Sequence, residues 1–215
     1  MTPRFAQAVD PIFLATLDLV DRINRSATIS VQDERVRLRE LFDHAEAMLG
    51  AAPEWQLAKY ALVSWIDELL VDLPWSGREW WSNNVLEVEL FNTRLCNERF
   101  FVRGKEASAL ASRDALEVFY DCVLLGFRGL YRDARLADAL TRAHGLPSDL
   151  PGWLRQASQS IKVGQGRPSL GMARYDLRGA PPLKSRASLI WAWLSAALLA
   201  AVNILYYAVI YTRYH

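Results

Sequence analysis

Residues 60–75 read YALVSWIDELLVDLPW, a run in which apolar side chains recur at intervals of three and four. That spacing puts them on one face of a helix, the pattern of an element that packs against a core. The positions that share this face, including one just upstream, are Ala58, Leu62, Trp65, Ile66 and Leu69. Because proline is tolerated at a helix start and ends a helix that precedes it, we expect the helix to open at Pro53 and to close before Pro74.

Similar signals continue on both sides of this helix. Residues 31–49 carry an unbroken apolar stripe, with Ser30 in the N-cap position and Gly50 as a left-handed stop. Two further helices are expected, one from about Ser112 and one over 133–144. Runs of alternating β-branched residues, which would indicate strands, do not occur in the sequence. The sequence therefore predicts an all-α bundle of six to eight helices.

The first helix is expected to begin at Pro11. Asp10 would be its N-cap, and proline is favoured at the first helical position, so the pair predicts a helix that runs to about Asn24. Its expected buried face consists of Phe13, Leu17 and Val20.

Composition excludes several classes of protein without selecting one. The chain has 215 residues, of which 52% are hydrophobic and 23% charged, so a largely disordered chain is excluded. A net charge of +1 argues against a nucleic-acid binder, which needs a basic surface. The two cysteines, Cys96 and Cys122, cannot build a disulfide framework.

The 25 residues from 187 to 211 contain no charged side chain. As a helix that rises about 1.5 Å per residue they would cover roughly 37 Å, enough to cross a hydrocarbon core about 30 Å thick. Aromatic residues typical of membrane interfaces lie near both ends: Trp191, Trp193, Tyr206, Tyr207 and Tyr211. We therefore expect 187–211 to be a C-terminal transmembrane helix, the alternative being a buried core helix.

The charges around this segment predict its orientation. Residues 164–186 are rich in Gly and Pro, and six basic residues against one acidic residue lie between positions 162 and 186. The positive-inside rule then places 1–163 in the cytoplasm as a helical domain and 212–215 outside as a short tail. With 23 acidic against 18 basic residues, residues 1–161 carry a net charge of −5. We interpret 164–186 as a basic juxtamembrane linker near anionic headgroups, the alternative being an ordered loop packed on the helical domain.

No segment of the sequence has the pattern of an active site. The three histidines, His44, His144 and His215, are far apart, and no phosphate-binding or nucleophile-elbow motif occurs. Asp67 and Glu68 stand out, but neighbouring helix positions point about 100° apart, which argues against paired acid–base catalysis. That geometry lets one carboxylate face inward and fix a neighbouring helix end while the other stays outside. The alternative is two solvated charges on a helix surface.

An aromatic cluster follows at residues 75–84. Trp75, Trp80 and Trp81 fall within seven residues around a Pro/Gly turn. Tryptophan is enriched in binding hot spots, so Trp80 and Trp81 are candidates for binding a partner. Core packing at a junction of helices is the alternative, because tryptophan buries a large area.

Three blocks of the sequence, taken in order, carry a family resemblance. They are residues 60–75, quoted above, residues 75–101, WSGREWWSNNVLEVELFNTRLCNERFF, and residues 115–133, ALEVFYDCVLLGFRGLYRD. Together they resemble the DotU/IcmH family, whose members in type VI secretion systems are called TssL. The resemblance covers the helical domain and includes the single C-terminal span.

The resemblance implies a structural role and no enzymatic activity. Members have a hook-shaped cytoplasmic domain of two helical sub-bundles, tail-anchored in the bacterial inner membrane with the C-terminus in the periplasm. They form a membrane complex with a large TssM-like inner-membrane subunit and a TssJ-like lipoprotein. They also contact TssK-like and TssE-like baseplate proteins and so dock the contractile tail. No catalytic residue, cofactor or metal is expected. Some relatives carry their own wall-anchoring domain, and if anchoring is needed here, another subunit is expected to supply it.

Five residues are expected to bind partners. Asp67 and Glu68 are expected to line the cleft between the sub-bundles, with Trp80 and Trp81 as weaker candidates. Asn203, a polar amide in an apolar segment, is expected to face a partner span from a second copy or from the large subunit, the alternative being a side chain that faces lipid. Two other functions are kept as alternatives: a DotU subunit of a type IVB secretion system that stabilises a different large partner, and a membrane-tethered enzyme with an unrecognised site.

Overall fold

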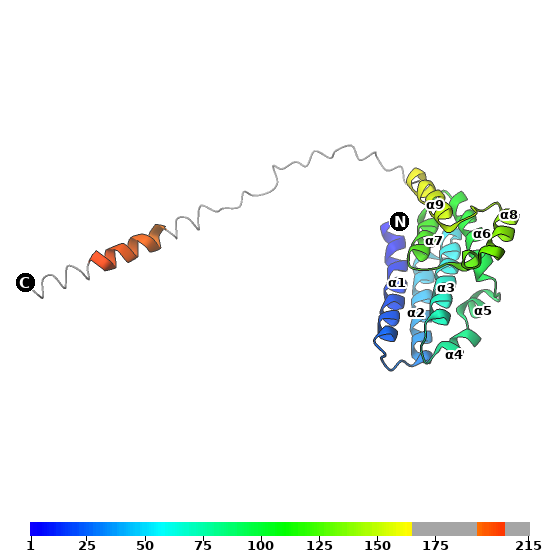
Figure 1. Cartoon of the computed structure of the whole chain (residues 1–215), viewed down its shortest axis with the longest axis horizontal. Helices are drawn as coiled ribbons and strands as arrows, with labels where there is room; N and C mark the ends of the chain where they lie inside the picture. The colour runs from blue at the N-terminus through cyan, green and yellow to red at the C-terminus, as the bar shows by residue number, and fades with distance from the viewer. Residues whose placement is uncertain (165–192, 205–215) are drawn as a thin grey trace, which may run out of the picture. The chain divides into compact units, whose positions relative to one another are not determined.

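The computed structural model describes residues 1–164 and 193–204, which belong to two compact units, Met1–Arg167, called the head below, and Pro168–His215. Every regular element in residues 1–164 is a helix, which confirms the all-α prediction (Figure 1). The elements are α1 (Pro3–Asn24), α2 (Val31–Leu49), α3 (Pro53–Asp72), α4 (Arg78–Asn83), α5 (Leu86–Phe91), α6 (Cys96–Ala109), α7 (Asp114–Leu124), the 3-10 helix η1 (Gly129–Arg132), α8 (Ala134–His144) and α9 (Leu150–Gly164).

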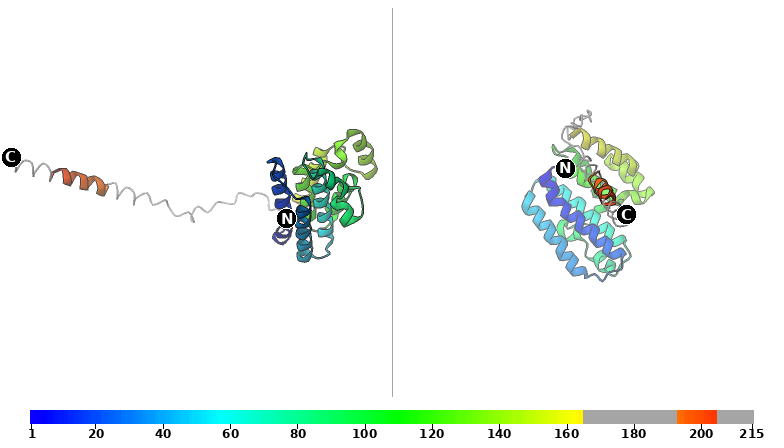
Figure 2. Two further views of the ribbon diagram at one scale, coloured as in Figure 1. Left: turned by 90° about the horizontal axis from the view of Figure 1, so that it is seen from below. Right: turned by 90° about the vertical axis from the view of Figure 1, so that its left-hand side faces the viewer.

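Helix α3 is the centre of the head. Its residues 60–66 are completely buried, and α1, α2, α4, α5, α6 and α7 all contact it. Helices α1 and α2 lie side by side as an outer layer, which Figure 2 shows most clearly in its right-hand view. Because residues 60–66 are buried on every side, other helices have to enclose them, and this part of the run over residues 60–75 organises the elements around it.

Helices α2 and α3 begin and end where the sequence predicts. The Ser30 hydroxyl accepts a hydrogen bond from the backbone N–H of Asp33 at 3.4 Å, and Gly50 ends α2 with a φ of +69°. Helix α3 spans Pro53–Asp72, between its two prolines. The helices expected from about Ser112 and over 133–144 are α7 and α8.

The prediction for the first helix is wrong at its start. Helix α1 begins at Pro3 with Thr2 as its N-cap, and Pro11 lies inside the helix. Thr2 donates its backbone N–H and its hydroxyl to the carboxylate of Asp114, both at 2.7 Å, and these tertiary bonds fix the first turn. Pro11 removes one helix hydrogen bond, which burial of apolar residues in the preceding turns, such as Val9 at 0% exposure, offsets.

One apolar cluster runs through the whole head. Its aromatic centre contains Phe100 and Phe101 of α6, Phe127 and Trp153. The rings of Phe100 and Phe127 stack with centres 3.9 Å apart, and the ring of Phe101 meets that of Trp153 edge-on at 5.2 Å. The described helices of the head therefore share one core, and a division into two sub-bundles stays a prediction.

The second unit contains a described helix over residues 193–204, whose side chains are exposed. Within it, Asn203 Nδ2 donates a hydrogen bond to the Leu199 carbonyl oxygen at 3.2 Å. Among the described residues no helix has the length and apolar character needed to cross a membrane. The rest of the expected span over 187–211, the linker from residue 165 onward and the tail over 212–215 lie outside the described residues.

Candidate functional site

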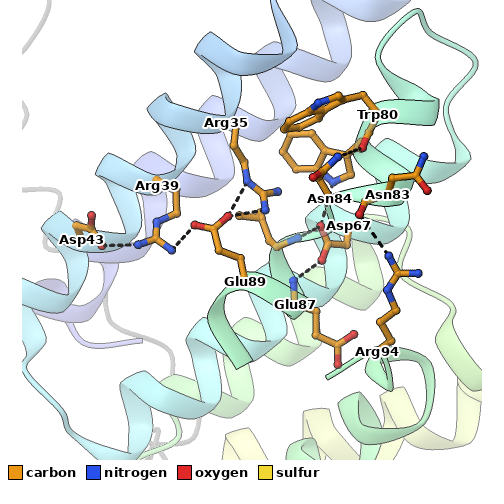
Figure 3. A network of polar contacts seen from close by, with 12 residues as sticks. Arg35, Arg39, Asp43, Asp67, Trp80, Asn83, Asn84, Glu87, Glu89 and Arg94 are labelled. Atoms are coloured by element: carbon orange, nitrogen blue, oxygen red, sulfur yellow. Dashed lines mark hydrogen bonds and ion pairs between the residues drawn. The ribbon is translucent and has the colours of Figure 1, made fainter. Parts of the chain in front are cut away.

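The two adjacent acidic residues of α3 bind different segments of the chain. Asp67 points toward α4 and α5 (Figure 3). Its Oδ1 accepts hydrogen bonds from Leu86 N at 2.8 Å and Trp81 Nε1 at 2.9 Å, and its Oδ2 accepts one from Glu87 N at 2.8 Å. The first N–H groups of a helix lack intrahelical partners and carry partial positive charge, so they favour a carboxylate. Asp67 therefore caps α5 and holds Trp81 of α4 against α3.

Burial dominates the electrostatics of Asp67. The residue is 3% exposed, and this desolvation raises the pKa of Asp67 to about 6 although its three hydrogen bonds favour the charged form. Arg35 of α2 also favours the charged form, and its guanidinium lies 4.9 Å from the centre of the Trp81 ring. Arg35 and Arg39 both pair with Glu89 at 2.6 Å, so α2 and α5 are joined next to the buried carboxylate (Figure 3).

Glu87, in the first turn of α5, caps the start of α6, as Asp67 caps the start of α5. Its Oε1 accepts hydrogen bonds from Tyr60 Oη at 2.8 Å and Leu95 N at 3.0 Å, and its Oε2 accepts one from Cys96 N at 3.1 Å. Glu87 is buried. Burial, together with the charge of Glu87, raises the pKa values of Tyr60 and Cys96 far enough that both stay protonated at neutral pH.

Glu68 binds η1 instead of α5. Its Oε1 accepts a hydrogen bond from Arg128 N at 2.7 Å and pairs with Arg132 at 3.1 Å, and its Oε2 accepts one from Gly129 N at 2.9 Å. Its side chain is 7% exposed. Gly129 has a φ of +47°, and a Cβ there would lie 2.9 Å from the Asn97 carbonyl oxygen, so only glycine fits. Glu68 thus caps η1 and fixes a tight backbone approach to α6.

A groove of about 340 Å³ lies between the start of α6, η1 and α8. Its lining residues are Arg94, Leu95, Asn97, Glu98, Gly129, Leu130, Arg132, Asp133 and Leu140. Glu68 lies behind this groove and fixes two of its lining residues, Gly129 and Arg132. Three leucines line the groove together with side chains of both charges, and Leu95 is 47% exposed. An apolar pocket with polar, charged surroundings is the anatomy of a protein-docking surface.

The prediction that Asp67 lines a cleft open to partners is wrong. Asp67 and Trp81 are buried, so neither lines a surface that a partner can touch. The interpretation that one carboxylate stays outside is wrong, because Glu68 also faces inward. Trp80 is half-buried, with its ring centre 6.3 Å from that of Trp81. Asn203 belongs to the other unit.

Sequence reasoning missed Glu87 and Arg132. An acidic residue three positions after Asn84, among apolar neighbours, is a helix-start signal that could have pointed to Glu87. Arg132 lies near the end of the family block over residues 115–133, but its pairing with Glu68 spans 64 positions and leaves no local signal. In the part of the chain that the structure describes, no three His, Cys, Asp or Glu side chains are grouped so that they could hold a metal ion.

Comparisons with known proteins agree with this architecture. The family model for the type VI secretion system protein DotU matches residues 4–213. The cytoplasmic domain of TssL from Acinetobacter baumannii has a similar fold, with a TM-score of 0.55 and 23% sequence identity over 74% of this chain and 98% of that one. No curated protein sequence matches the chain significantly. Because the family model covers nearly the whole chain, the protein belongs to the DotU family of type VI secretion system proteins.

Proposed function

We propose that the protein is a non-catalytic scaffold subunit of a type VI secretion system, anchored in the inner membrane, whose head docks the baseplate through the groove between α6, η1 and α8. The observation that supports this most is that groove, whose shape Glu68 fixes from behind, in a member of the DotU family. TssK-like and TssE-like baseplate proteins are the proposed occupants.

The groove is suited to a rigid docking step. Glu68 holds the backbone of Arg128 and Gly129 and the guanidinium of Arg132, so η1 is fixed before a partner arrives. A site fixed in advance loses less conformational entropy on binding than a mobile one. Exposed Leu95 offers an apolar anchor, and the charges around it select a partner of complementary pattern.

The proposed membrane anchor is the segment 187–211, with the N-terminus in the cytoplasm and the C-terminus in the periplasm. An anchor confines the search for partners to two dimensions and raises their effective concentration, so weak contacts suffice. The proposed neighbours in the membrane complex are a TssM-like large subunit, a TssJ-like lipoprotein and a second copy of the chain.

Asn203 is proposed to face a neighbouring span. Its Nδ2 already donates to the Leu199 carbonyl, which leaves its second N–H and its Oδ1 for another helix. A hydrogen bond between membrane helices contributes about 0.6–2 kcal/mol. Asn203→Leu is expected to insert normally and to crosslink less to its neighbours, and unchanged crosslinking would contradict this role.

The experiment that tests the function is affinity purification of the full-length protein from detergent-solubilised native membranes, with co-purifying chains identified by mass spectrometry. We expect a large inner-membrane subunit together with baseplate proteins. Leu95→Arg, which puts a charge into the groove, is expected to lose the baseplate proteins and keep the large subunit. Val36→Arg, at a comparably exposed position of α2, is the matched control.

Two outcomes would overturn the proposal. The large subunit recovered without any baseplate or tail component would favour the type IVB alternative. The protein recovered alone, in cells that express the apparatus, would contradict a scaffold role altogether.

A further inference from the structure

Helices α1 and α7 leave an apolar and acidic face exposed on the head. Leu17, expected on the buried side of its helix, is 39% exposed, and Leu14 is 66% exposed. At the end of α7, Leu124 and Leu125 are 57% and 38% exposed. We call this surface the α1–α7 face; it consists of Asp10, Leu14, Leu17, Asp121, Leu124 and Leu125. The groove of the proposed function contains none of these residues.

The two helices run in the same direction and nearly in register. Thr2, at the start of α1, bonds Asp114, at the start of α7. Further along, the rings of Phe13 and Trp65 have centres 5.1 Å apart, and Trp65 Nε1 donates to the Leu125 carbonyl at 3.4 Å. Position 2 of α1 is therefore level with position 114 of α7, and position 13 of α1 is level with about position 125, at the end of α7.

Helical spacing then assembles the face. Leu14 and Leu17 follow Asp10 by four and seven residues, and Leu124 and Leu125 follow Asp121 by three and four. Residues at these separations share one side of a helix. Asp10 and Asp121 therefore form an acidic end of the face, and the four leucines form an apolar end one to two turns further along.

Neither Asp10 nor Asp121 forms an ion pair within the described residues, and the amino terminus is the one positive charge that acts on Asp121 there. Asp121 is half-buried, and burial together with the like charge of Asp10 raises the pKa of Asp121, opposed only by the amino terminus. Other surface carboxylates of the head are paired with arginine, such as Asp18 with Arg37 and Glu89 with Arg39, whereas no ion pair is formed by Asp10 or Asp121 within residues 1–164 and 193–204. Two neighbouring carboxylates next to exposed leucines leave a place for a cation carried on an apolar surface.

We propose that the α1–α7 face is a second docking surface, which binds an amphipathic helix of another subunit that carries a Lys or Arg one to two turns from its apolar residues. Charge complementarity selects this occupant. A second copy of the head would present the same face, which offers no cation to the acidic pair, and the two carboxylates would repel an anionic lipid surface. The leucines alone would bind any apolar surface, so the acidic pair determines which partner binds and in which orientation.

The test places a photo-crosslinking amino acid at Leu14 or at Leu124 of the full-length protein, in cells with the assembled apparatus, and sequences the crosslinked peptides. Both positions are expected to reach one segment of another subunit in which basic and apolar residues share a helix face. The same probe at Val36, 56% exposed on α2, is expected to give a different product or none.

Charge dependence is the second readout. Asp10→Asn combined with Asp121→Asn is expected to lower the crosslinking yield about fivefold, because the basic residue loses both partners. This variant removes a repulsion, so it is expected to unfold no more easily than the wild type. Asp33→Asn combined with Glu40→Gln, at two exposed positions of α2, changes the net charge equally and is expected to leave the yield unchanged.

A crosslink to a second copy, to residues 164–186 of the chain itself or to a segment without basic residues would overturn the proposal. The absence of any crosslink would overturn it as well. So would a crosslinking yield that the Asp10/Asp121 variant does not change. The groove variant Leu95→Arg is expected to leave these crosslinks intact. Failure of this surface and failure of the proposed groove can therefore be distinguished.

Discussion

The two sides of α3 are each tied to it by one carboxylate, but they differ in their access to solvent. On the α4–α5 side, Asp67 is 3% exposed, and the backbone groups that it caps are enclosed in the head. On the η1 side, Glu68 binds Arg132, whose side chain is 51% exposed and lines a groove. Neighbouring residues of one motif thus serve different regions. We infer that Asp67 stabilises the head, whereas Glu68 shapes a surface for a partner.

The largest expected effect is that of Asp67→Ala. Removing the carboxylate leaves the N–H groups of Leu86, Glu87 and Trp81 without an acceptor, and buried unsatisfied donors are costly, so the free energy of unfolding should fall by about 3 kcal/mol. Urea unfolding of the full-length protein in detergent, followed by circular dichroism, measures this. Asp43→Ala, which breaks only an exposed ion pair with Arg39, should cost at most about 0.5 kcal/mol.

Ionisation of Asp67 should make stability depend on pH. Its folded-state pKa of about 6 lies above the ordinary value of 3.8, so the folded state binds this proton more tightly than the unfolded state. The resulting stabilisation is fully present below about pH 4 and is lost as pH rises to about 6, a change of about 2–3 kcal/mol. The free energy of unfolding is measured against pH for the wild type and for Asp67→Asn, and the difference between the two curves gives the contribution of Asp67. A difference that stays flat between pH 4 and 7 would contradict the raised pKa.

Glu68→Ala should destabilise the head less than Asp67→Ala does. Water can reach the exposed Arg132 and the region of Arg128 once the carboxylate is gone, so we expect a loss of about 1–2 kcal/mol in the free energy of unfolding. The same urea titration measures it. A loss as large as that of Asp67→Ala would remove the distinction between the two sides of α3.

The junction of α2 and α5 compares a moderate effect with a small one. Arg39→Ala removes an exposed ion pair with Glu89 and should cost at most about 0.5 kcal/mol. Arg35→Ala also removes a largely buried guanidinium from the face of Trp81 and should cost about 1–2 kcal/mol. Equal losses in the two variants would indicate that the contact with Trp81 contributes nothing.

The fold could be predicted from sequence where local signals and tertiary contacts agree. Ser30 and Gly50 bound α2 as their capping preferences require, and α3 fills the space between its two prolines. At the N-terminus a long-range contact outweighs the local signal, because Asp114 fixes the first turn at Thr2 and α1 continues through Pro11. The spacing of residues within the first helix cannot predict this contact between Thr2 and Asp114.

The candidate site could be predicted only in part, for a similar reason. The 100° rule correctly separates Asp67 from Glu68 in direction. Whether each carboxylate meets solvent or another element depends on α5 and η1, which begin 19 and 61 residues further along the chain. The groove itself combines residues from α6, η1 and α8, so it has no signature in any one segment.

The role of Glu68 is tested most directly by comparing docking with folding in one variant. Full-length Glu68→Ala is purified from native membranes, its helix content and unfolding midpoint are measured, and the co-purified baseplate protein is quantified per folded molecule. We expect a folded protein that retains the large membrane subunit and recovers less than about a tenth of the wild-type amount of baseplate protein, a loss of hot-spot size. A folded Glu68→Ala protein with wild-type recovery of the baseplate would contradict the role of Glu68 and of the groove that it supports.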